Sequence, residues 1–128
     1  MYADNFLELV IAQKYIGIMK DLMSAICYHS SHCKIIFTND SDNKLSIDLM
    51  TLNSNKEILH SIKIQDIEVK YFKCDLSKVQ IIVDSTILGN RFRNIRINDP
   101  IVMYMSESKD KLYVYNLDDN NNYNCLIF

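Results

Sequence analysis

The spacing of apolar residues switches twice along this chain from strand-like to helix-like and back, and this order limits the possible folds. Between residues 13 and 26, large apolar residues recur every three or four positions. At about 100° per residue, such residues gather on one side of a helix: Tyr15, Ile16, Ile18, Met19, Leu22, Met23 and Ile26. The opposite side carries Lys14, Gly17, Lys20, Asp21 and Ser24. The spacing therefore predicts an amphipathic helix over 13–26.

A second helix is predicted over residues 85–95. The sequence Asp84-Ser85-Thr86 supplies side chains that cap helix N termini, and Pro100 stops the segment. A narrow apolar stripe is formed by Leu88, Phe92 and Ile95. Facing away from it are Thr86, Asn90, Arg93 and Asn94, with Arg91 and Arg96 on the flanks.

The other apolar segments alternate with period two or form short runs, which predicts strands. They span residues 6–11, 34–38, 45–49, 58–64, 67–71, 79–83, 101–105 and 112–117. Two helices separated by several strands indicate an α+β fold, with the helices packed on a mostly antiparallel sheet. We expect one domain over residues 1–128, in which 118–128 form a polar turn and the start of a further strand or connector.

Charge and hydropathy exclude several classes of protein. The net charge is −2, which argues against a protein that coats nucleic acid through bulk electrostatics but allows a small basic patch. No apolar run approaches the roughly 18 residues of a membrane helix, and the first residues lack the basic start of a secretory signal. An intracellular protein with reduced thiols is expected.

The cluster Cys27-x-His29-x-x-His32-Cys33 holds the side chains that zinc prefers. Structural zinc sites usually combine two short motifs from separate segments, and four ligands within seven residues can hardly reach one ion without strain. We therefore predict a helix end and a turn here, and no metal. A Cys/His nucleophilic pair would also lack an orienting acid.

No other pattern predicts catalysis or a cofactor. The only glycines are Gly17 and Gly89, so no phosphate-binding glycine loop is possible. Each lies in a helical pattern, where glycine lowers the stability of the helix by about 1 kcal/mol relative to alanine. Two explanations of such a glycine stay open: another backbone approaches the helix closely there, or the helix simply tolerates a glycine at that position. No carboxylate pair is placed for acid–base chemistry, so we predict that the chain is not an enzyme.

The polar helix faces remain as candidate binding surfaces. The first carries Lys14 and Lys20, and the second carries Arg91, Arg93 and Arg96 beside Asn90 and Asn94. Cations and amides at helical spacing suit contact with phosphates more than stacking on bases. Such residues also populate any solvated helix face, so the spacing alone leaves both interpretations open.

The order of these segments resembles a known family. The opening apolar strand, a helix containing Lys20-Asp21-Leu22-Met23, the hairpin over 34–51, the step Tyr71-Phe72-Lys73-Cys74-Asp75 and the strand that runs into Asp84-Ser85-Thr86 carry the resemblance. They are similar to the amino-terminal domain of the proliferating-cell-nuclear-antigen family of DNA sliding clamps. The similarity covers roughly residues 6–117 and rests on the order and spacing of elements.

The resemblance implies a ring in which helices line the inside and sheets the outside. Members of the family encircle duplex DNA and tether polymerases and other replication proteins. It implies DNA contact by Lys14, Lys20, Arg91, Arg93 and, on the flank, Arg96. It also implies that strand 112–117 pairs with a neighbouring subunit at a domain edge through Leu112, Tyr113, Val114, Tyr115 and Leu117.

The chain departs from the family in two places. It stops where the interdomain connector and second domain should follow, and residues 53–65 are longer than the corresponding loop. Three interpretations of the chain stay open: it is a fragment of a longer clamp, a one-domain variant, or a divergent relative, for example a viral one. The family's partner-binding groove relies on the connector and is not assigned.

The first hypothesis is thus a processivity or DNA-tethering domain without a cofactor that self-associates or joins a second clamp domain. We expect a nuclear location in a eukaryotic cell or a viral replication compartment. The second hypothesis is a clamp-shaped protein–protein interaction module, such as a viral transcription or assembly factor, that does not bind DNA. A zinc module using Cys27, His29, His32 and Cys33 is the third.

Overall fold

The computed structural model describes residues 7–28, 30–39, 44–65, 69–74, 76–96, 98–105, 112–116 and 126–127. Several expected features lie outside these ranges: Phe6 and Ile67 at two strand starts, His29, the turn 40–43, Leu117 and the polar part of the tail. Within the described ranges, each predicted helix and strand is present, with boundaries shifted by a few residues.

The described strands form two antiparallel sheets. One has the order β5-β1-β7-β8-β9, from Val69–Cys74, Leu7–Ile11, Ile101–Met105, Tyr113–Asn116 and Leu126–Ile127. The other has the order β4-β3-β2-β6, from Ile58–Gln65, Leu45–Leu52, His32–Asn39 and Lys78–Asp84. The prediction of a single sheet was wrong, because alternation identifies strands without identifying their partners: β1 pairs with β5 and β7 and not with β2.

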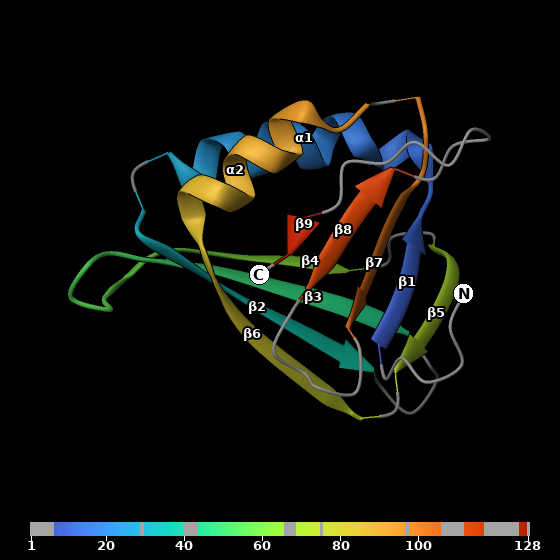
Figure 1. Ribbon diagram of the computed structural model, residues 1–128. Helices are drawn as coiled ribbons and strands as arrows, with labels where there is room; N and C mark the ends of the chain where they lie inside the picture. Colours follow the sequence, from blue (N-terminus) through green and yellow to red (C-terminus); the bar gives the residue numbers. More distant parts are fainter. Residues whose placement is uncertain are drawn as a thin grey trace.

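The two helices lie side by side along one side of the molecule, with the strands beneath them (Figure 1). The first begins as a 3₁₀ turn, η1 (Gln13–Tyr15), and continues as α1 (Ile16–Cys27). The second, α2 (Ser85–Asn94), is capped as predicted, because an Asp84 carboxylate oxygen accepts a hydrogen bond of 3.0 Å from the Ile87 N–H.

One hydrophobic cluster fills the space between the helices and the two sheets. The apolar stripe of α2 is buried as predicted, with Leu88, Phe92 and Ile95 at most 2% exposed. On β3, buried and half-buried residues alternate, as expected for a strand with one face on the core. One helix residue departs from the prediction, since Ile18 on the expected apolar side of α1 is 69% exposed.

The two glycines have different environments. A Cβ atom built on Gly89 would lie 3.2 Å from the Cys27 Cβ, so α2 approaches α1 closely at this position. A Cβ atom on Gly17 would meet nothing within 4 Å. Close approach therefore explains Gly89, and simple tolerance explains Gly17.

This difference predicts opposite effects on stability. Gly17→Ala should raise the free energy of unfolding by about 0.5–1 kcal/mol, because alanine favours the helix and restricts the unfolded chain. Gly89→Val should lower it by about 1–3 kcal/mol, because the helices must separate to make room. Urea denaturation of both variants measures the two values, and equal stability of Gly89→Val and the wild type would contradict the close contact.

Candidate functional site

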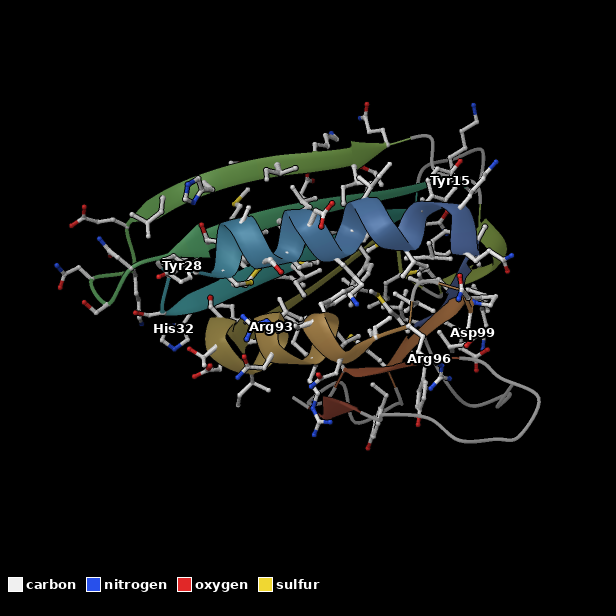
Figure 2. All side chains as sticks on the ribbon, turned by 90° about the horizontal axis from the view of Figure 1, so that it is seen from above. Tyr15, Tyr28, His32, Arg93, Arg96 and Asp99 are labelled. Atoms are coloured by element: carbon white, nitrogen blue, oxygen red, sulfur yellow. The ribbon has the colours of Figure 1, made fainter. Side chains whose placement is uncertain are left out.

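Four of the five predicted DNA-facing cations are exposed, namely Lys14, Arg91, Arg93 and Arg96. Figure 2 shows the helix side of the molecule from above, and Arg93 and Arg96 are labelled there. Lys14 lies in η1, and its ammonium is 5.2 Å from the centroid of the Tyr15 ring. Arg91 and Arg93 lie in the last turns of α2. The two adjacent helical segments thus both carry exposed cations.

Lys20 has a different environment from the one expected. Its ammonium is half-buried and donates a 2.6 Å hydrogen bond to the backbone carbonyl oxygen of Ile95. Ile95 is the residue that ends α2, where backbone carbonyls carry partial negative charge. Lys20 therefore joins α1 to the C-terminal end of α2. No local pattern predicts this contact, because the two residues are 75 positions apart in the sequence.

Arg96 is paired within the chain. Its Nε donates to the Asp99 carboxylate at 2.8 Å, and the two side chains are 45% and 31% exposed. This ion pair reduces the local positive charge, although an exposed pair of this kind adds at most about 1 kcal/mol to stability. In Figure 2, Arg96 and Asp99 lie at the opposite end of the helix pair from Arg93.

A groove of about 110 Å³ lies between the end of α1 and α2, and along α2 its lining extends from Ser85 to Arg93. Its lining residues are Ser24, Cys27, Tyr28, Ser85, Thr86, Gly89, Asn90 and Arg93. The start of α2 is held there by a 2.8 Å hydrogen bond from the Ser30 hydroxyl to the Ser85 hydroxyl. The sequence had singled out most of these residues separately, but it did not predict that they meet, because a groove between helices depends on how they pack.

The expected zinc ligands are distributed between core and surface. Cys27 and Cys33 are buried, whereas His32 is exposed and His29 lies outside the described residues. Burial raises the pKa of the Cys27 thiol to about 11, and burial together with the nearby Cys27 raises the pKa of Cys33 to about 12. Among the described side chains, no group of three or more His, Cys, Asp or Glu residues could hold a metal ion.

The raised pKa values predict low thiol reactivity. At pH 8, thiolates are about one thousandth or less of Cys27 and Cys33, and both side chains are shielded from reagents. Iodoacetamide should therefore alkylate the half-exposed Cys74 much faster than either buried thiol. Mass spectrometry of peptides over time measures the three rates, and rapid modification of Cys27 would contradict its burial.

The strand expected at a subunit edge lies inside its sheet. β8 pairs with β7 on one side and with β9 on the other, so the edge placement was wrong for the described strands. Leu112 and Val114 are 0% and 1% exposed and belong to the core, whereas Tyr113 stacks on Tyr104 with ring centroids 4.5 Å apart. The side chain of Tyr115 and the whole of Leu117 lie outside the description. The outermost described strands are β5 and β9 in one sheet and β4 and β6 in the other.

The comparisons with known proteins point to viral relatives. No family model matches the chain. It is 34% identical over 121 residues to uncharacterized protein L52 of Acanthamoeba polyphaga mimivirus, an alignment that covers 92% of this chain and 85% of that protein. The chain belongs to the family of that viral protein.

A further relative carries a functional description. The chain is 30% identical over 93 residues to a probable DNA polymerase sliding clamp of the same virus. The alignment covers 72% of this chain and 20% of the clamp, so the chain corresponds to about a fifth of that protein's length. This partial similarity agrees with the resemblance to sliding clamps that the order of elements indicates, and the α+β fold with two paired helices is compatible with it.

None of the described helices is long and apolar enough to cross a membrane.

The environment of Lys20 generates a prediction about stability. Lys20→Met keeps the aliphatic stem but removes the charge and the bond to the Ile95 carbonyl, so the free energy of unfolding should fall by about 1–2 kcal/mol. Lys14→Met, at an exposed position of the same helical segment, should change it by less than about 0.5 kcal/mol. Thermal and urea denaturation compare the two variants, and equal losses would show that the contact does not stabilise the fold.

Proposed function

We propose that this chain is a non-enzymatic DNA-tethering domain of the sliding-clamp kind, whose paired helices face duplex DNA. The observation that carries the proposal is that the two adjacent helical segments bear the exposed cations Lys14, Arg91 and Arg93, in a chain related over 93 residues to a probable sliding clamp. Cations on a helix face suit contact with backbone phosphates, which are the same in every sequence. The proposed contact with DNA is therefore independent of base sequence.

The electrostatics favour a weak contact. Asp21 is exposed on α1, Arg96 is paired with Asp99, and Lys20 is engaged with the Ile95 carbonyl. Few phosphates would be neutralised, so affinity would be low and would fall with salt. A clamp holds DNA by surrounding it, and a net charge of −2 with a modest basic face suits that mode of retention.

Surrounding DNA requires more than this one domain. The chain matches about a fifth of the related clamp, so the proposed ring forms by self-association or by joining a second clamp domain. Outermost strands offer unpaired backbone groups for such assembly. Of the candidates, β4 exposes the apolar residues Ile58 and Leu59, at 61% and 41%. The ring would recruit a DNA polymerase or other replication proteins in a viral replication compartment.

The second candidate is a protein–protein interaction module that does not bind DNA. It is favoured by the apolar side chains on the helix side, where Ile18 is 69% and Tyr28 is 77% exposed. Side chains of this kind form the centres of protein interfaces. Partner binding in this case would depend little on salt.

The experiment compares two charge reversals of equal size. Arg91→Glu with Arg93→Glu alters the helix face, and Lys63→Glu with Lys78→Glu alters exposed positions on β4 and β6. The helix-face variant should lose at least about tenfold in affinity for a labelled duplex at about 0.01 M ionic strength, whereas the strand variant should lose much less. Fluorescence anisotropy measures both affinities.

Light scattering over a range of concentrations complements this test. A discrete multiple of the 15.0 kDa chain identifies the proposed assembly, and retention on circular against linear DNA then tests whether DNA passes through it. Equal losses of affinity in the two double variants would contradict the helix-face proposal, and no binding of the duplex by the wild type would favour the interaction module.

A further inference from the structure

The groove between α1 and α2 combines a narrow base with a polar rim. At its base, Gly89 presents no side chain, and its Cα lies so close to α1 that an added Cβ would be 3.2 Å from the Cys27 Cβ. Around the rim are the hydroxyls of Ser24, Tyr28 and Thr86, the amide of Asn90 and the guanidinium of Arg93. The groove is therefore lined chiefly by groups that can donate hydrogen bonds.

The charges at the groove favour an anion. None of its lining residues is acidic, and burial keeps the Cys27 thiol neutral by raising its pKa to about 11. Among the described residues, Arg93 makes no ion pair, in contrast to Arg96, which is bonded to Asp99. The carboxylate of Asp84, next to the groove in sequence, accepts a hydrogen bond from the Ile87 N–H. Arg93 is therefore the one charged side chain among the lining residues of the groove.

The size of the groove suits a small tetrahedral anion. A volume of about 110 Å³ is several times the roughly 10–15 Å³ that one water molecule needs. Arginine can present two parallel N–H donors to two oxygens of a phosphate, and neighbouring hydroxyls can donate to the remaining oxygen.

We propose that this groove binds a single phosphate group of a nucleic-acid backbone, held by the Arg93 guanidinium with Thr86 and Asn90 as further donors. The inference rests on the proposed function and gives the helix face one defined phosphate position in place of a diffuse positive field. It makes Arg93 a specific contact, whereas Arg91, exposed on the same helix and outside the groove, contributes charge alone.

Variants that preserve the positive charge distinguish a specific phosphate contact of Arg93 from a general electrostatic attraction by the helix face. Arg93→Lys keeps the charge but removes the paired donors, and Thr86→Val removes a hydroxyl with little change of shape. Each should weaken binding of a duplex of about 20 base pairs by roughly three- to tenfold at low salt. Arg91→Lys, the matched control, should change it by less than about twofold. All three positions are exposed, and circular dichroism verifies that each variant is folded.

The outcomes distinguish this inference from the proposed function. If Arg93→Lys, Thr86→Val and Arg91→Lys all bind the duplex like the wild type, the groove proposal is overturned while DNA binding stands. If the wild type binds no duplex at low salt, the proposed function fails, and the groove proposal fails with it.

Amide chemical shifts identify the source of the phosphate. Titration with the duplex should shift the amide signals of Thr86, Gly89 and Asn90, and inorganic phosphate should shift the same signals only at much higher concentration. Shifts caused by inorganic phosphate without any caused by the duplex would overturn the proposal in favour of a free-anion site.

Discussion

The close packing of α1 against α2 is the contact on which the rest of the arrangement depends. At Gly89 the two helices approach closely, since an added Cβ there would lie only 3.2 Å from that of Cys27. At the other end of the pair, the Lys20 ammonium holds the Ile95 carbonyl. These two contacts keep the helices side by side. The hydrophobic cluster beneath them packs the helix pair against both sheets.

The same packing creates the candidate binding surface. Because the helices are adjacent, segments that are far apart in the sequence and carry exposed cations lie side by side, and a groove forms between the end of α1 and α2. The surface is only mildly positive, since Lys20 and Arg96 are engaged within the chain. A ring that surrounds DNA retains it even when the surface has little affinity for DNA. Such a mildly positive surface therefore agrees better with a clamp than with a protein that binds DNA mainly through electrostatic attraction to phosphates.

The division of the strands into two sheets has its own consequence for assembly. Each sheet has outermost strands with backbone groups available for pairing, and the strand predicted for subunit contact is not among them. β8 instead contributes buried residues to the core between two neighbours. The outermost described strands include β4, which the sequence predicted as a strand, and β9, which lies in the segment predicted as a turn and the start of a strand or connector.

The sequence by itself determined the elements and much of the core, because hydrophobic period and capping chemistry act over a few neighbouring residues. The Asp84 cap, the buried stripe of Leu88, Phe92 and Ile95 and the antiparallel α+β class were all predicted correctly. Only the tertiary structure decided that Lys20 joins two helices, that Arg96 is neutralised by Asp99 and that a groove exists beside Arg93. These features arise where side chains distant in sequence meet or where a helix ends against a neighbour, and no local periodicity records them.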